Sequence, residues 1–328
     1  MNQHQLIYSV FGAVVLLALV FDLGLLSKKN KKIDLKTAII QTVFWVTLSF
    51  AFCAFIWWQN EDGNGKKDAL LFLTAYLLEW SLSVDNIFVF IIIFSFFKVK
   101  EIHFSRVLLL GILMAIFFRI IFIAVGSGLV AKFDWIMYLF GIFLVFTGIK
   151  MFASDEGDDF NPETNWAYRF LSKLMPTTND EANGNFTVRK NGKLFFTTLA
   201  MVVVMLGLID IVFAIDSIPA VFSVIPDPSK KMLIYSSNIF AVLGLRSLFF
   251  LLRGAASKFD YLQEGIAIVL LFIGVKMLLP LLKYAGVNPK HLHVPEWVSL
   301  LVIIICITGS IIYSKYNKKD GTPDDQLG

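Results

Sequence analysis

Two segments of the chain carry the same pattern of acidic residues inside apolar runs long enough to cross a membrane. Both read acid, five residues, aspartate, a small polar residue and isoleucine, first at Glu79–Ile87 and again at Asp210–Ile218. A charged carboxylate at bilayer depth costs about 2.5–3.5 kcal/mol on insertion scales, so such residues mark functional sites. The pattern therefore predicts the two halves of one ion site, whose four carboxylates are Glu79, Asp85, Asp210 and Asp216.

The apolar runs around these acids belong to a wider pattern. Apolar residues make up 57% of the 328 residues and charged residues only 16%. Several apolar runs exceed the roughly 20 residues that a helix needs to cross a bilayer. This composition excludes an ordinary soluble protein and predicts an all-α polytopic membrane protein with about nine transmembrane helices. The expected spans are 5–26, 36–59, 69–97, 104–126, 133–152, 194–225, 232–252, 261–282 and 296–314.

Basic residues indicate the orientation of these spans. Lys28, Lys29, Lys31 and Lys32 crowd the first predicted loop, and the positive-inside rule places such a loop in the cytoplasm. The N-terminus is then outside and the C-terminus is cytoplasmic. The first apolar run has no Lys or Arg before it and no small-residue cleavage site, so we expect a retained span and no signal peptide. The net charge of +4 reflects this topology, and we expect no nucleic-acid partner.

Residues outside the acidic motifs also recur, in the same order and at nearly constant offsets. Each copy covers three predicted spans, and because three is odd, the second unit enters the membrane from the opposite face. The sequence thus predicts a 3+3 inverted-topology repeat, which in secondary transporters places the binding site at the repeat interface. A duplication for packing alone would not explain why the recurring positions are mostly charged. The paired positions are Arg119 with Arg246, Lys132–Asp134 with Lys258–Asp260, and Gly148–Met151 with Gly274–Met277.

The repeat divides the chain into five parts. Two N-terminal helices (1–68) precede unit one (69–152), and unit two (194–282) precedes a last helix with a cytoplasmic tail (283–328). The polar segment 153–193 between the units is expected to be an amphipathic or flexible cytoplasmic linker. It begins acidic but lacks the glycine and closing glutamate that an EF-hand calcium loop needs at fixed offsets.

Helical spacing constrains how the acids of each motif can be used. Glu79 and Asn86 are seven residues apart and lie on one helix face, whereas Asp85 points about 120° away from Glu79. The second motif has the same spacing. Each acid therefore faces a different neighbour, or the helix is broken locally. Pro219 removes a backbone hydrogen bond just after Asp216, which favours a break there and would expose carbonyl oxygens beside the carboxylates.

The side chains of the two motifs offer only oxygen ligands. Such ligands suit hard divalent cations such as Mn²⁺, Ca²⁺ and Mg²⁺, and no Cys, Met or His stands in the motifs to favour a soft metal. Cys53 and Cys306 lack the spacing of a disulfide framework or a thiolate site. Asp22 in the first span is either a fifth carboxylate of the site or an acid that reaches the cytoplasmic interface. The candidate metal ligands are Glu79, Asp85, Asn86, Asp210, Asp216, Ser217 and Asp22.

Four carboxylates around one dication leave excess negative charge. At least one of them should then be protonated when metal is bound, unless a second cation is present. The surplus predicts coupling between cation export and proton entry, with flux that depends on pH.

Two arginines, Arg119 and Arg246, are also expected at membrane depth. An unpaired cation there is costly, so each should lie beside a carboxylate. Asp134 and Asp260 begin the next spans and are the candidate partners. We interpret all four residues as structural ion pairs, in preference to transport gates.

At the acidic motifs the chain resembles the TerC family of integral membrane proteins, within the larger LysE-type transporter superfamily. The segments that carry the resemblance are Glu79–Phe90 and Asp210–Ala220, and it extends over roughly residues 5–315. The Asp-bearing first span and the long central linker are similar to those of the Alx-type members. The resemblance implies Mn²⁺ export across the bacterial inner membrane, with tellurite resistance as the family's historical label. It maps the family's motif acids onto Glu79, Asp85, Asp210 and Asp216.

The leading hypothesis is a divalent-cation transporter in the lipid bilayer, without enzymatic activity or a cofactor. An intramembrane aspartyl protease also needs two Asp on separate spans, but it carries a Gly-x-Gly-Asp run, and here the run is Gly207-Leu-Ile-Asp210. The alternative that stays open is a membrane scaffold that assists metallation or assembly of exported proteins. A transport assay discriminates the two, because the acids of a scaffold can be changed without changing cellular metal content.

Overall fold

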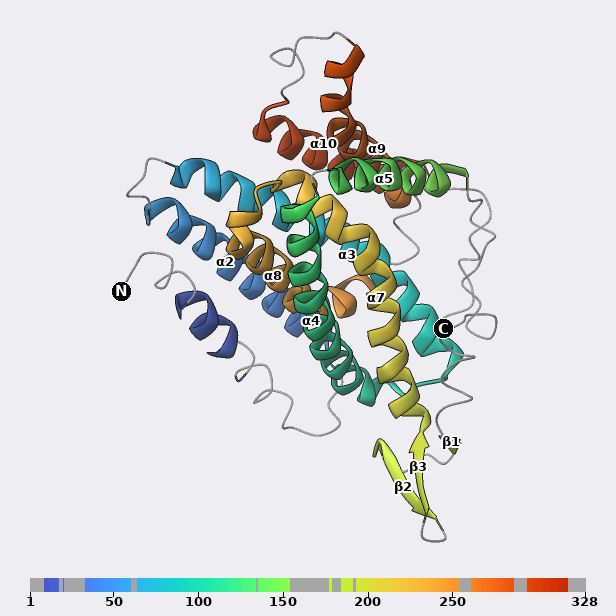
Figure 1. Ribbon diagram of the computed structural model, residues 1–328. Helices are drawn as coiled ribbons and strands as arrows, with labels where there is room; N and C mark the ends of the chain where they lie inside the picture. The colour runs from blue at the N-terminus through green and yellow to red at the C-terminus, as the bar shows by residue number, and fades with distance from the viewer. Residues whose placement is uncertain are drawn as a thin grey trace.

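The computed structural model describes residues 9–17, 20, 33–59, 64–133, 135–153, 177–178, 184–190, 193–253, 261–285 and 294–317 (Figure 1). Residues 9–17 are helical. The further helices are α2 (Leu35–Trp58), α3 (Gly65–Phe96), α4 (Glu101–Lys132), α5 (Ile136–Ala153), α7 (Thr198–Val224), α8 (Lys231–Arg253), α9 (Leu262–Leu278) and α10 (Glu296–Tyr316). The remaining elements are strands β1 (Thr177–Thr178), β2 (Thr187–Lys190) and β3 (Lys193–Thr197) and the 3-10 segments η1 (Pro228–Lys230) and η3 (Leu279–Ala285).

The helices have the length and composition of membrane spans. Six of those described are long and apolar enough to cross a membrane, in α2, α4, α7, α8, α9 and α10. The apolar part of α5, Ile136–Phe152, is shorter, and α3 is 32 residues long but is not among the six. The all-α polytopic membrane fold is thus confirmed, whereas the number of nine spans stays a prediction.

Capping and turn residues stand at the starts and ends of the helices. Thr197 caps the start of α7, where its side chain accepts a hydrogen bond from the Ala200 amide. The helix ends at Val224, just before a proline-rich turn that leads into η1. Pro295 stands directly before α10, a position at which its missing N–H costs nothing.

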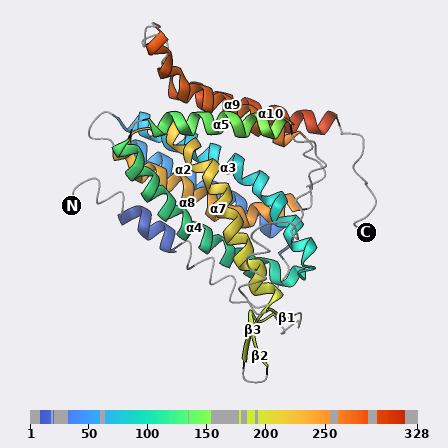
Figure 2. The same ribbon diagram turned by 45° about the vertical axis from the view of Figure 1, so that its right-hand side comes forward.

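The helices form two layers that cross each other (Figures 1 and 2). One layer contains α2, α3, α4, α7 and α8. The other contains α5, α9 and α10, which lie side by side along one face of the first. Among the helices of the first layer, α3 and α7 also contact each other and pack against the second layer, so they occupy the centre of the molecule.

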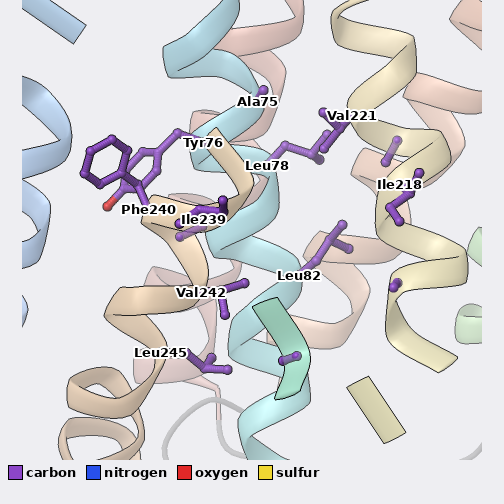
Figure 3. Packing of buried hydrophobic residues seen from close by; sticks show 14 of the residues in the cluster. Ala75, Tyr76, Leu78, Leu82, Ile218, Val221, Ile239, Phe240, Val242 and Leu245 are labelled. Atoms are coloured by element: carbon purple, nitrogen blue, oxygen red, sulfur yellow. The ribbon is translucent and has the colours of Figure 1, made fainter. Parts of the chain in front are cut away.

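Apolar side chains fill the space between the central helices (Figure 3). Leu78 and Leu82 of α3 lie between Ile218 of α7 and Val242 of α8, and all are buried. The labels in Figure 3 also show that α3 and α7 run in opposite directions. Glu79 and Asp210, the first acids of the two motifs, are therefore buried in a core between antiparallel helices.

A small sheet projects from the end of the bundle where α7 begins (Figure 1). Its order is β1-β3-β2, with β1 parallel and β2 antiparallel to β3, and Thr187 is paired with Phe196. Arg106 of α4 anchors the sheet because it donates to the Gly184 carbonyl at 3.0 Å and stacks over the Phe186 ring at 4.5 Å. The sequence analysis did not predict these strands, and the sixth span starts at Thr198 and not at residue 194.

The expected break in the second motif is wrong. Both α3 and α7 are continuous helices through their motifs, and Pro219 lies inside α7. A proline removes only the bond from its own nitrogen, and here Pro219 is buried against neighbouring helices that support the remaining turns. The continuous helix therefore frees no carbonyl beyond that of Ile215, which would have accepted from the missing Pro219 N–H.

Glycines allow α5 and α9 to pack very closely. A Cβ on Gly148 would lie 2.8 Å from Leu271 and 3.0 Å from the Ala267 carbonyl. A Cβ on Gly274 would lie 2.8 Å from the Gly141 carbonyl and 2.8 Å from Val145. Small residues at helix interfaces bring backbones together in this way inside membranes.

Candidate functional site

A buried cluster of one arginine and three acceptor side chains lies where four helices meet. Arg119 of α4 donates hydrogen bonds to both carboxylate oxygens of Asp210 on α7, from Nε to Oδ2 at 3.1 Å and from Nη2 to Oδ1 at 3.2 Å. Its Nη1 donates to Glu79 on α3 and, at 2.9 Å, to the side-chain oxygen of Asn238 on α8. One guanidinium thus joins the first acids of the two motifs.

The cluster is excluded from the surface and its formal charges are unequal. Glu79 and Asn238 are 0% exposed, and Arg119 and Asp210 are 1% exposed. With both acids ionised, two negative charges face one positive charge, which leaves a net charge of −1. Uncompensated charge in a dry environment is costly, so the cluster favours one further positive charge. The Glu79 Oε2 atom is buried and makes no hydrogen bond within the described residues.

Helical periodicity explains why Arg119 points inward from an otherwise apolar segment. Its neighbours Phe117, Ile120 and Ile121 are 61%, 42% and 44% exposed on the outer face of α4, whereas Arg119 is 1% exposed. The apolar residues suit lipid, and the guanidinium finds its partners on α3, α7 and α8.

Arg119 was expected to lie beside a carboxylate, and in the described structure it contacts two. They are Glu79 and Asp210, whereas Asp134 lies outside the described residues. Arg246 is 2% exposed on α8. Asp260, its expected partner, is also outside the described part of the chain, so that pairing stays a prediction.

The second acids of the motifs are located only by their helices. Asp85 lies within α3 and Asp216 within α7, and the positions of their side chains are not described. Their neighbours Asn86 and Ser217 are buried, at 6% and 2% exposure. Asp22 lies outside the described residues.

Several hydroxyl groups close to the motifs have no hydrogen-bond partner in the described structure. They include Ser83, one turn after Glu79 on α3, and Ser217 on α7. Within the ranges described, no group of three or more His, Cys, Asp or Glu side chains is placed to hold a metal ion. These hydroxyl oxygens can therefore form further hydrogen bonds that the described protein groups do not supply.

Asn238 is a site residue that the sequence analysis missed. It belongs to a run of three polar residues, Ser236, Ser237 and Asn238, all 0% exposed within apolar α8. The two serines bond to carbonyls of their own helix, Leu233 and Ile234. Only the longer Asn238 side chain reaches across to Arg119. A polar run in an apolar span was the signal that could have identified it.

The structure thus defines a polytopic membrane protein with a buried ionic cluster at its centre. A family model described as "Integral membrane protein TerC family" matches residues 64–322. This range contains both acidic motifs and most of the chain. The chain therefore belongs to the TerC family.

Curated relatives agree with this assignment. The chain is 41% identical to the "Putative membrane-bound redox modulator Alx" of Escherichia coli (strain K12) over 303 residues, which cover 91% of this chain and 90% of that protein. The protein of the same name from Shigella flexneri is also 41% identical, over 91% of each chain. The "Uncharacterized membrane protein STKORF319" of Myxococcus xanthus is 38% identical, over 97% of this chain and 95% of that protein. No solved structure matches the chain.

Proposed function

We propose that this protein transports a divalent metal cation across the bacterial inner membrane, and that the cation is Mn²⁺, which it exports. The observation that carries the proposal is the buried cluster in which Glu79 and Asp210 share Arg119. Two carboxylates at this depth are expensive, and one guanidinium does not balance their charge. A cation that passes through the site would supply the missing charge. The choice of Mn²⁺ rests on the oxygen-only ligands and on the family resemblance.

The 3+3 inverted repeat is part of the proposal. Under the pairing of Gly148 with Gly274, the contacts between α5 and α9 are reciprocal, because Gly148 meets Leu271 and Ala267 and Gly274 meets the equivalent residues. The repeat pairs α3 with α7 and α4 with α8. The contact of α3 with α8 therefore corresponds to the contact of α7 with α4, and both are present. Such an exchange is expected of two units related by a two-fold axis in the membrane plane.

In this arrangement the second acids are the direct ligands of the cation. Asp85 and Asp216 bind it together with the neutral oxygens of Asn86 and Ser217. Because α3 and α7 run in opposite directions, the order of acids along one helix is the reverse of the order along the other (Figure 3). All four acids then fall within one zone of the membrane. Asp22 of the first span is a further candidate ligand.

Arg119 has a defined role in this proposal. It holds Glu79 and Asp210 together while no metal is bound, as a cation that cannot leave the protein. A dication that reaches Asp85 and Asp216 then meets two carboxylates whose charge is only partly compensated. A proton bound at the cluster is released or taken up as the metal moves, which couples export to proton entry.

The orientation follows the basic residues, with the N-terminus outside and the C-terminus in the cytoplasm. The small sheet and the start of α4 then face the cytoplasm, and η1 faces outward.

The name of the Alx relatives refers to redox modulation, which thiols can perform. The described thiols, Cys53 on α2 and Cys306 on α10, are both free. The Cys53 thiol donates to the Ala69 carbonyl at 3.4 Å. These two positions give no support to a dithiol reaction, and the scaffold hypothesis is the alternative that the transport test must exclude.

The test is metal flux into proteoliposomes that contain the purified full-length protein. Mn²⁺ flux should exceed flux of Mg²⁺, Ca²⁺ and Zn²⁺, and it should respond to an imposed pH gradient. Asp85→Asn and Asp216→Asn keep side-chain volume and remove charge, so each should abolish Mn²⁺ flux and cellular Mn²⁺ tolerance at unchanged protein level.

Asp68→Asn is the matched control for these variants. Asp68 is also an aspartate of α3, but it lies in the first turn and pairs with Lys230 at the end of the bundle. Its replacement should leave flux intact. Full Mn²⁺ flux by Asp85→Asn or Asp216→Asn would show that the replaced acid is structural. Absence of flux from the unaltered protein, with tolerance retained in cells, would favour the scaffold.

A further inference from the structure

A cavity of about 340 Å³ opens at the end of the bundle where α3 and α8 finish and α4 begins. It lies far along α3 from the buried cluster, so it is not part of the proposed transport site. Three cations, Lys98, Lys100 and Arg253, and one carboxylate, Glu101, surround its mouth. The net charge of these four side chains is positive. The positive-inside rule assigns this end of the bundle to the cytoplasm.

Buried aromatic residues form the apolar part of the cavity lining. Phe94, Phe104 and Phe249 line the cavity, and all three are at most 5% exposed. Their rings form one cluster, with centroids 4.5 Å apart for Phe94 and Phe104 and 5.4 Å apart for Phe94 and Phe249. The cavity therefore has a cationic rim over an aromatic base, which suits a ligand with an anionic head and an apolar body.

Arg253 is held in place at this rim. Its guanidinium donates to Glu101 at 2.5 Å and lies 4.6 Å from the centre of the Phe104 ring. An arginine fixed in this way presents its other donors to a ligand at low entropic cost. Lys98 and Lys100, both exposed, add further positive charge at the rim.

Lys98 has an unusual backbone for its residue type. Its φ of +48° is the only positive φ among the non-glycine residues described. The Lys98 amide donates to the Ser95 carbonyl at 3.1 Å and the Val99 amide to the Phe94 carbonyl at 3.0 Å, which is the pairing of a Schellman helix end. Glycine is the residue that adopts this conformation without strain. The chain instead places a lysine there, and its side chain lines the cavity.

From these observations we propose that the cavity binds the phosphodiester headgroup of an anionic phospholipid. Lys98, Lys100 and Arg253 contact the phosphate, and the first carbons of the lipid rest on Phe94 and Phe104. The cavity lies at the ends of membrane helices, which is the level of the lipid headgroups. The cytoplasmic leaflet, which this end of the bundle faces, carries anionic lipids. A soluble phosphate would not need the aromatic base.

The experiment is a lipid titration of the purified full-length protein, followed by native mass spectrometry. Phosphatidylglycerol and phosphatidylcholine with identical acyl chains are compared. The unaltered protein should retain one phosphatidylglycerol at lipid concentrations where phosphatidylcholine is lost. Lys98→Gln should weaken the retained phosphatidylglycerol about fivefold, the effect of one basic residue close to a membrane surface.

Two further variants separate binding from helix stability. Lys98→Gly removes the charge but suits the left-handed backbone, so it should lose the lipid to the same extent while the Tm stays equal or rises. Lys66→Gln neutralises an exposed lysine at the opposite end of α3 and should bind as the unaltered protein does.

Four results would overturn the proposal. Equal retention of the two lipids would show that charge is not recognised. An equal loss in Lys66→Gln and Lys98→Gln would show a general effect of surface charge. No loss in Lys98→Gly would show that Lys98→Gln acts through the helix end and not through a lost contact with the lipid. Displacement of phosphatidylglycerol by an equimolar amount of sn-glycerol 3-phosphate would identify a site for a soluble anion.

Discussion

The protein joins its helices in two chemically opposite ways. Between α5 and α9, glycines bring two backbones into contact. Among α3, α4, α7 and α8, a guanidinium and two carboxylates form the contact in the interior. In a bilayer, apolar burial does not favour helix association, so packing and polar bonds must do so. The glycine contact depends on volume, and the ionic cluster depends on charge balance.

This difference gives each region its own sensitivity. A glycine contact should tolerate changes of charge elsewhere but not an added methyl group. The ionic cluster should tolerate exchange for a residue of similar size only when its net charge does not become more negative. Variants at the two regions, and at an exposed carboxylate for reference, test this contrast.

The largest effect is expected at Arg119. Arg119→Gln leaves Glu79 and Asp210 buried with a net charge of −2, and removal of one member of a buried ion pair costs about 3–5 kcal/mol. The amount of folded protein extracted from membranes should fall sharply, together with its Tm in detergent.

Glu79→Gln is the matched change at the same cluster, because it removes a negative charge where Arg119→Gln removes a positive one. It leaves one carboxylate for one guanidinium, so the folded protein should be as abundant and as stable as the unaltered one, while Mn²⁺ flux falls. The double variant Arg119→Gln/Glu79→Gln should be more stable than Arg119→Gln alone, because it carries one buried negative charge fewer. If Arg119→Gln were stable and active, the guanidinium would not be the counter-ion of these acids.

A smaller loss is expected at the glycine contact. Gly274→Ala places a Cβ 2.8 Å from backbone atoms of Gly141 and Val145, which cannot rotate away. Overpacking of this kind costs about 1–3 kcal/mol, so the Tm should fall. Gly128→Ala is the control, because a Cβ there meets nothing within 4 Å and removes glycine's flexibility in a helix. Equal Tm values for the two variants would show that α5 and α9 are not in close contact.

The smallest effect concerns Asp227, an exposed acid between α7 and α8. Its side chain accepts a hydrogen bond from the Ser229 amide at 2.9 Å, and hydrogen bonds from Ser229 lower its pKa. A lowered pKa gives stability that is complete above the unfolded value of about 3.9 and is lost as the pH falls through the folded value. Asp227→Ala should cost about 0.5 kcal/mol at neutral pH, the low end for a lost cap.

Asp227→Asn controls for the cap, because the amide oxygen still accepts the hydrogen bond. Its stability should match the unaltered protein at neutral pH and show a weaker loss on acidification. The measurement is the Tm between neutral and strongly acidic pH. A loss from Asp227→Ala as large as that from Arg119→Gln would contradict the contrast between exposed and buried charge.

Much of the candidate site could be read from the sequence because charge in an apolar run is a local signal. Glu79, Asp210 and Arg119 stood out for this reason, and the requirement for a buried partner for Arg119 agrees with the geometry. Asn238 did not stand out, because an uncharged amide costs less in a span. The short strands before α7 were missed for two reasons. Strand β2 is a run of only four residues in the polar linker, and the apolar residues of β3 continue into the predicted sixth span.

The helix break at Pro219 was predicted from a local rule that tertiary contacts override. A proline weakens a helix by one bond, but buried neighbours on both sides can hold the remaining turns in place. The sequence pattern alone could not reveal those neighbours.

The sequence by itself determined that this protein is a membrane protein with carboxylates and an arginine in its interior. These properties follow from the composition of single segments and from the cost of charge in lipid. Only the tertiary structure decided that Arg119 meets Glu79 and Asp210 together. The guanidinium meets one carboxylate on α3, the helix directly before α4, and a second on α7, 91 residues further along the chain. Pairing depends on which helices become neighbours, and no local pattern of residues contains that information.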